Sequence, residues 1–163
     1  MKQRRRYISP LQSFDVHLQN YQNLIRDLRK KKDVEHVLQI VNDCLTTSSL
    51  SHFLSDEYDA LVLTNTSQNI LWVSEGFTHM TGYSKKYALG KTPVFLQGKE
   101  TSVEVRNQIR EELKSKHSFT GNILNYRKNG EKYLCNITIL PIYNNKENLK
   151  YFLALEKEER MSA

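Results

Sequence analysis

The stretch SFTGNILNYRKNGEKYLCNITILPIY, residues 118–143, decides the fold, because it predicts two long strands joined by a tight turn. Residues 118–127 and 131–143 are rich in Ile, Leu, Tyr and Thr, which is typical of strands. Asn129 and Gly130 stand between them, and an Asn-Gly pair favours the turn of a β-hairpin. The stretch therefore predicts an antiparallel hairpin.

Further strands are predicted on both sides of this hairpin. One follows it at 149–158, and two shorter ones precede it at 59–65 and 70–74. The residues between 75 and 117 carry helical signals instead. We therefore expect an α+β fold, with one five-stranded antiparallel sheet and these helices grouped on one face of it. A pocket would lie between the sheet and the helices.

The longest helix of this region is predicted at 101–117. Thr101 is its expected N-cap, and Glu104 three residues later completes a capping box. Apolar residues recur at helical spacing and predict the face that packs on the sheet: Val105, Ile109 and Leu113.

Two helices are predicted before the sheet. The first starts at Pro10, with Ser9 as its N-cap, and ends at the basic run 29–32. Its apolar seam, with spacings of three and four residues, consists of Phe14, Leu18, Tyr21, Ile25 and Leu28. The second is expected at 33–45 with Asp33 as its cap, and 46–52 reads as a linker. The chain would then divide into a helical extension, 1–52, and a folded domain, 53–160.

The composition indicates an ordinary globular chain. Its 163 residues are enough for one domain with an appendage, and 39% are hydrophobic and 26% charged. No apolar run approaches the roughly 20 residues that span a bilayer, so we expect no membrane partner. Cys44 and Cys135 lie far apart in the sequence, which argues against a disulfide framework or a zinc site and favours a reducing cytoplasm.

The formal charge of +6 raises nucleic-acid binding as an alternative function. Basic residues cluster at 2–6 and 26–32, in and beside the first predicted helix. Such clusters can contact phosphates. No aromatic residues interleave with them as a stacking surface would need, and acidic residues stand among them, so a solvated helix face is the preferred interpretation.

Several motifs together resemble one known family. WVSEGFTHMTGYS (72–84), FLQGKET (95–101), IREEL (109–113) and TGNILNYRKNG (120–130) resemble a PAS domain, specifically the LOV branch of flavin-binding blue-light sensors. The resemblance covers Ala60 to Glu158. It implies the same five-stranded sheet, a pocket on one face, and dimer or partner contacts through the sheet and flanking helices.

The resemblance assigns three retained residues to a flavin site. Gln97 matches a Gln near the ribityl chain, Arg110 a phosphate-binding Arg, and Asn125 an Asn that reads the pyrimidine edge. Each also has a structural alternative, as a loop tie, a solvated helix residue or a sheet-edge residue. A fold can outlive the function of its site.

Other positions of the same site are replaced. Pro93 stands where LOV domains carry the Cys that forms the flavin adduct, which requires a thiol. Thr92 replaces an Asn, Val94 the second phosphate-binding Arg, Cys135 the second Asn, and Glu156 the Gln that faces the reactive edge of the ring. An ionised Glu156 would repel the carbonyl edge of a flavin. The resemblance thus implies a pocket without tight flavin binding; flavin mononucleotide held without an adduct is the alternative, with Thr92, Gln97, Arg110, Asn125 and Glu156 as the site.

The sequence contains no catalytic constellation, so we expect no enzyme. The preferred function is a PAS sensor and protein-interaction module in signal transduction, without adduct photochemistry. An isolated helix with an apolar seam needs a partner, so we expect a homodimer through Phe14, Leu18, Tyr21, Ile25 and Leu28. The signalling partner stays unidentified. The alternatives are a flavoprotein that forms no cysteinyl adduct, and nucleic-acid binding through the basic N-terminal helices.

Overall fold

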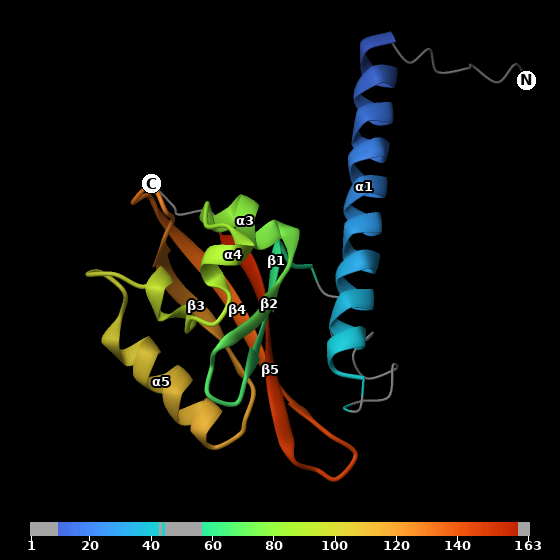
Figure 1. The fold of residues 1–163 in the computed structure, drawn as a ribbon. Coiled ribbons are helices and arrows are strands. Elements are labelled where there is room, and N and C mark those ends of the chain that lie inside the picture. The colour runs from blue at the N-terminus through green and yellow to red at the C-terminus, as the bar shows by residue number, and fades with distance from the viewer. Residues whose placement is uncertain (1–9, 43, 45–56, 160–163) are drawn as a thin grey trace, which may run out of the picture.

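The computed structural model describes residues 10–42, 44 and 57–159 of the chain. They form a five-stranded antiparallel sheet in the order β2-β1-β5-β4-β3, with one long helix beside it (Figure 1). The elements are α1 (Pro10–Ile40), β1 (Ala60–Asn65), β2 (Ile70–Val73), α3 (Glu75–Thr81), α4 (Lys85–Ala88), the 3-10 turn η1 (Pro93–Leu96), α5 (Val103–Lys114), β3 (Phe119–Tyr126), β4 (Lys132–Tyr143) and β5 (Leu149–Glu159). The expected α+β fold and its sheet are confirmed. Of the described helices, none is long and apolar enough to cross a membrane.

The hairpin at the centre of the sequence prediction is present as β3 and β4. Asn125 pairs with Tyr133 next to the turn, and the register runs without a shift to Phe119 and Ile139. Gly130 has a φ of 87° and its N–H donates to the Arg127 carbonyl at 2.9 Å. Gly130 is the only residue of this turn with a positive φ. The hairpin loop therefore has the three-residue form, which ends in a left-handed glycine, and not the two-residue form.

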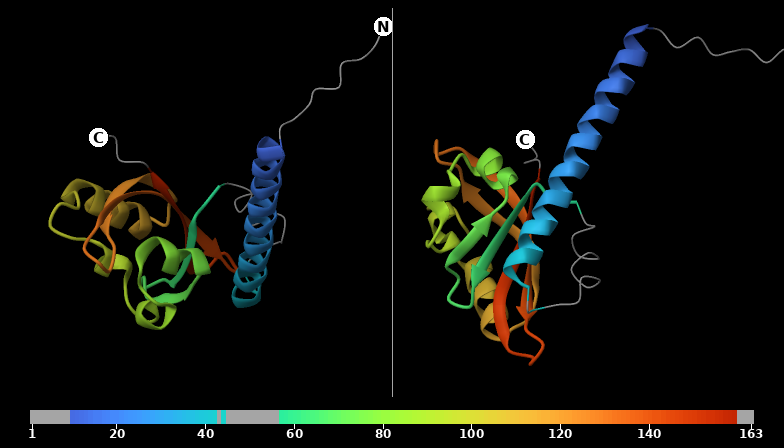
Figure 2. Two further views of the ribbon diagram at one scale, coloured as in Figure 1. Left: turned by 90° about the horizontal axis from the view of Figure 1, so that it is seen from above. Right: turned by 45° about the vertical axis from the view of Figure 1, so that its right-hand side comes forward.

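The sheet lies between α1 on one side and the helices α3, α4 and α5 on the other (Figure 2), and it separates two apolar layers. Because side chains alternate along a strand, Ala60 and Val62 of β1 face α3, η1 and α5, while Leu61 and Leu63 face α1. The inner layer includes the predicted face of α5, with Leu113 buried and Val105 and Ile109 packed against it. The outer layer receives the C-terminal part of α1 through Val37, and it also contains Val41 and Cys44, which follow the helix.

The expectation of two N-terminal helices is wrong. Within the described residues α1 is one helix of 31 residues, and the basic run 29–32 lies inside it. Lys and Arg are good helix formers, and no Gly or Pro interrupts the run, so the helix continues through it. Asp33 is consequently a mid-helix residue instead of a cap; its carboxyl is half-buried, and burial raises its pKa. Ser9, Leu45 and the linker 46–52 lie outside the described residues.

The predicted N-cap of α5 is displaced by one residue. Ser102 caps the helix, because its hydroxyl accepts from the Val105 N–H at 3.2 Å. The same hydroxyl donates to Glu104 at 2.7 Å, which lowers the pKa of that exposed carboxyl. Thr101 bonds to the sheet instead. Its buried hydroxyl donates to the Leu124 carbonyl at 2.7 Å and accepts from the Gly98 N–H at 2.9 Å. The loop before α5 is thereby fastened to β3.

Candidate functional site

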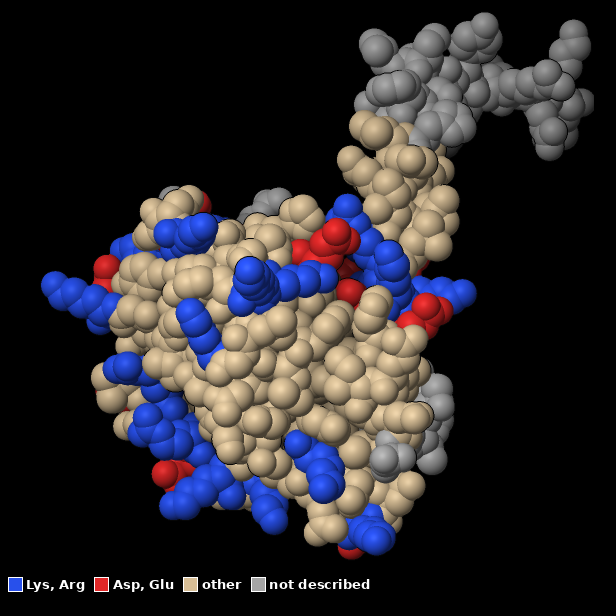
Figure 3. Space-filling model, viewed as in Figure 1, with Lys and Arg blue, Asp and Glu red and all other residues tan. Residues whose placement is uncertain are grey.

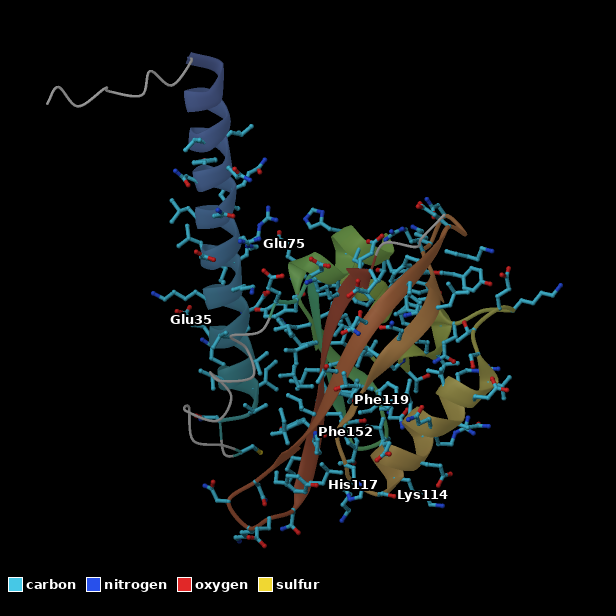
Figure 4. All side chains as sticks on the ribbon, turned by 180° about the vertical axis from the view of Figure 1, so that it is seen from behind. Glu35, Glu75, Lys114, His117, Phe119 and Phe152 are labelled. Atoms are coloured by element: carbon cyan, nitrogen blue, oxygen red, sulfur yellow. The ribbon has the colours of Figure 1, made fainter. Side chains whose placement is uncertain are left out.

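A cavity of about 90 Å³ lies between the inner face of the sheet and the segment formed by η1 and α5. Phe152 of β5, which lines it, lies on the side of the sheet that carries Phe119 and faces α5 (Figure 4). Most of the lining is apolar: Val62, Pro93, Val94, Leu96, Ile109, Leu113, Ile123, Ile137, Ile139, Phe152 and Ala154. The polar lining residues are Thr64, Gln68, Gln97, Asn125 and Glu156.

Glu156 is the most unusual residue of the lining. It lies in the middle of β5, paired with Ala60 of β1 and Ile137 of β4, and is only 2% exposed. Its Oε2 atom has no hydrogen-bond partner in the described part of the chain. Burial raises the pKa of this carboxyl from its ordinary value of 4.5 to about 7, because water no longer stabilises the charged form. The cavity therefore contains an acid poised to ionise near neutrality.

Asn125 and Gln97 complete the polar set that the sequence predicted. Asn125 of β3 is 4% exposed, and its Oδ1 atom also has no hydrogen-bond partner among the described residues. Its neighbour across the hairpin is Tyr133, a buried phenol whose pKa is raised by burial and by the charge of Glu156. Gln97 follows η1, where its backbone N–H donates to the Val94 carbonyl at 3.0 Å. The structure thus brings Gln97, Asn125 and Glu156 to one cavity.

Thr92 and Arg110 do not line this cavity. Thr92 precedes η1 and is exposed. Arg110 is exposed on α5, and its Nη1 donates to Asn107 one turn earlier at 3.3 Å. The assignment of these two residues to a ligand stays a prediction.

The residues that replace the reactive positions are also placed. Pro93 begins η1, a position that suits a residue without an N–H, and lines the cavity beside Val94. Cys135 of β4 is fully buried in the inner layer, and burial followed by the charge of Glu156 raises the pKa of its thiol. A thiol with a raised pKa is a poor nucleophile.

Sequence reasoning missed most of the apolar lining. Ile137 and Ile139 could have been found from the alternation of β4, which places every second residue on one face. Gln68 in the β1–β2 turn has a φ of 63° and carries no sequence signal that points to a cavity. Among the described residues, no group of three or more His, Cys, Asp or Glu is placed to hold a metal ion.

Known proteins with this arrangement identify the family. The model of the PAS domain family matches residues 59–158. The chain belongs to the PAS domain family. Its PAS domain is similar to a blue-light photoreceptor of Listeria innocua serovar 6a, with 38% identity over 89 residues that cover 55% of this chain and 35% of that protein. This chain therefore spans about a third of the length of that relative.

Solved structures place the PAS domain in the LOV branch. The light-state structure of the blue-light photoreceptor Aureochrome1 LOV matches with a TM-score of 0.61 and 26% identity, over 63% of this chain and 83% of that one. The light-state dimer of the fungal blue-light photoreceptor Vivid matches with a TM-score of 0.57 and 26% identity, over 60% of this chain and 75% of that one. The LOV resemblance of the sequence is thereby confirmed, and the chain contains a LOV-like sensor domain of signal transduction.

Proposed function

We propose that this chain is a non-enzymatic PAS sensor and protein-interaction module that works through α1, without flavin-adduct photochemistry. The observation that carries the proposal is an apolar face on the part of α1 that extends beyond the sheet. This face, here called the α1 stripe, is between 46% and 62% exposed and consists of Leu18, Tyr21, Leu24 and Leu28. Residues 16–25 contain no charged side chain, which leaves this length of helix uncharged (Figure 3).

A second copy of the chain is the proposed partner of the α1 stripe. Leu18, Tyr21 and Leu28 of the stripe, together with Ile25, follow the spacing of a coiled-coil seam, and a helix that leaves such a seam in water gains stability by pairing. Leu18, Tyr21 and Leu28 of the predicted seam belong to it; Ile25 is half-buried in the groove beside the domain, and the side chain of Phe14 lies outside the described residues. The light-state dimer of Vivid supports dimerisation as a way in which a LOV-like domain signals.

Light scattering after size exclusion tests the dimer. The full chain should be a dimer at micromolar concentration, and Leu18→Glu/Leu28→Glu should shift it to a monomer, because both charges fall on the stripe. Gln19→Glu/Asn23→Glu adds the same charge on the opposite side of α1 and should leave the dimer intact. A monomeric wild-type chain, or equal behaviour of both variants, would refute the proposal.

Several features of the cavity argue against a bound flavin. An engineered cavity of about 150 Å³ holds one benzene ring, whereas this one measures about 90 Å³ and a flavin has three fused rings. The unpartnered acceptors on Asn125 and Glu156 could accept only from the single N–H of the pyrimidine edge of a flavin, and an ionised Glu156 would repel the carbonyls of that edge. Pro93 supplies no thiol. These features support a LOV-like module that signals without flavin chemistry, and purified protein incubated with flavin mononucleotide should show no blue absorbance band.

Nucleic-acid binding has less support than dimerisation. Arg26, Arg29 and Lys30 line a groove that also contains the carboxylates of Asp33 and Glu75, so part of this basic surface faces acids of the chain itself. The remaining Lys and Arg side chains are spread around the face in Figure 3 rather than gathered along one track. Affinity for duplex DNA that falls steeply with salt would favour this alternative.

A further inference from the structure

Glu156 lacks the partner that its position demands. A buried carboxylate is stable only when it is hydrogen-bonded, paired with a cation or protonated. The carboxyl of Glu156 is 2% exposed, and its Oε2 is unpartnered within the described residues. In its ionised form this carboxyl therefore lacks a hydrogen-bond donor at Oε2, which only a bound donor or a proton would satisfy.

The neighbouring elements supply no cation. The residues paired with Glu156 on the adjacent strands are Ala60 and Ile137, and the cavity lining contains no Lys, Arg or His. The titratable groups that sense its charge are Tyr133 and Cys135, which are neutral when protonated. Arg127, the cation over the Tyr133 ring, is instead paired with Glu158 at 2.6 Å and also donates to the Met80 carbonyl.

The rest of the cavity limits what the missing partner can be. Its volume of about 90 Å³ suits a molecule of only a few heavy atoms. Its walls are mainly Val, Leu, Ile and Phe, so part of that molecule is apolar. Asn125 Oδ1 adds a second unpartnered acceptor, so more than one N–H group would be useful. Val94 of η1 lines the cavity and is 56% exposed, so the cavity lies close to the surface of the protein there.

We propose that the cavity binds a small organic cation of the amidinium or guanidinium type, held by the carboxylate of Glu156. Such a cation carries several N–H donors in one plane, so one of them can donate a charge-assisted hydrogen bond to Oε2 of Glu156 while another donates to Oδ1 of Asn125. A short alkyl group on the cation would contact the apolar wall. The inference rests on the proposed sensor function, because it names the ligand class of the cavity in that module.

Isosteric probes separate the contribution of charge from that of size. Acetamidinium, acetamide and acetate have nearly the same size and differ in charge and donors. In titration calorimetry with the full chain, acetamidinium should bind about tenfold or more tightly than acetamide, and acetate should not bind. Equal affinity for acetamidinium and acetamide would overturn the proposal. The absence of any acetamidinium binding would also overturn it and would indicate that the cavity holds only water.

Two variants and a control locate the binding. Glu156→Gln keeps the size of the side chain and removes its charge, so acetamidinium affinity should fall about tenfold or more. Ala154→Leu fills the cavity and should also abolish binding, by a route independent of charge. Glu159→Gln removes an exposed carboxylate from the same strand and should bind like the wild type. Unchanged binding by Glu156→Gln, with its fold checked by circular dichroism, would show that the cation binds elsewhere and would refute the inference.

The oligomeric state keeps this test separate from the proposed function. Glu156→Gln should remain a dimer, because the cavity lies on the inner face of the sheet, whereas α1 packs on the outer face and its stripe extends beyond the sheet. A cation that does not bind would overturn the ligand class while the light-scattering result still decides the dimer.

Discussion

Substituting Glu156 by Gln should make the chain more stable at alkaline pH and remove a specific part of its pH dependence. Glu156 is buried in β5 without a hydrogen-bond partner for Oε2 among the described residues, and burial raises its pKa to about 7. The amide of Gln has nearly the same size and no charge, so the substitution removes the ionisation and keeps the packing. The effect arises in the folded state, because the unfolded chain exposes Glu156 to water.

The sign follows from the two pKa values. Below pH 4.5 the carboxyl is protonated in both states and contributes nothing. Between pH 4.5 and about 7 the unfolded chain releases the proton while the folded chain keeps it, so the free energy of unfolding falls as pH rises. Above about 7 both states are ionised and the whole penalty is present. At about 1.4 kcal/mol for each pKa unit, the penalty is on the order of 3 kcal/mol.

Urea unfolding across this pH range, without added amidine, measures the effect. The difference in unfolding free energy between Glu156→Gln and the wild type should rise by on the order of 3 kcal/mol from pH 4.5 to pH 8. Comparing the two proteins cancels the other titrating groups, including Asp33. Glu159→Gln, an exposed carboxylate on the same strand, should show almost no change. Parallel pH curves for Glu156→Gln and the wild type would refute the reasoning.

Three further substitutions test the packing, each by chemical denaturation. Gly76→Ala should cost about 3 kcal/mol, because an added Cβ would lie 1.8 Å from the backbone oxygen of Asp59, which cannot yield; a stability equal to the wild type would contradict this close approach. Thr101→Val should cost about 2 kcal/mol by removing the buried hydroxyl that bonds Leu124, and a neutral result would show that the hydroxyl is dispensable. Val37→Ala should also cost about 2 kcal/mol and speed hydrogen exchange in α1, since Val37 is fully buried against the sheet; unchanged exchange would argue that α1 is held in another way.

The sheet was predictable because its signals are local. The Asn129–Gly130 turn lies between two strands whose residues alternate in burial, so pattern and turn agree along 118–143. The N-terminal helix was harder to predict, because the run of like charges at 29–32 indicates a break in the helix. Helix propensity and the burial of Val37 extend the helix instead. Ser102 and not Thr101 caps α5, because the Thr101 hydroxyl bonds to β3. A capping rule that uses only the local sequence cannot include this contact with a distant strand.

The candidate site was only partly predictable, for a related reason. The resemblance pointed to Gln97, Asn125 and Glu156, which do meet at the cavity, but it also pointed to Arg110, which faces solvent. A motif fixes the strand or helix on which a residue lies, whereas its direction depends on the neighbours. The volume of the cavity depends on the side chains that converge on it from β1, β3, β4, β5, η1 and α5. No single stretch of the sequence contains all of these side chains, so the volume could not be predicted from a motif.

The way α1 is fixed at one end has a mechanical consequence. Its C-terminal turn rests on the sheet through Val37, and its middle lines a groove with Tyr58 and Asp59, whereas the segment from Pro10 to Tyr21 extends beyond this groove for about 18 Å. A tilt of this end of the helix by about 10° would move its tip by about 3 Å. A small movement of β1 or β5 would thus become a larger displacement at the part of α1 that contacts a second subunit.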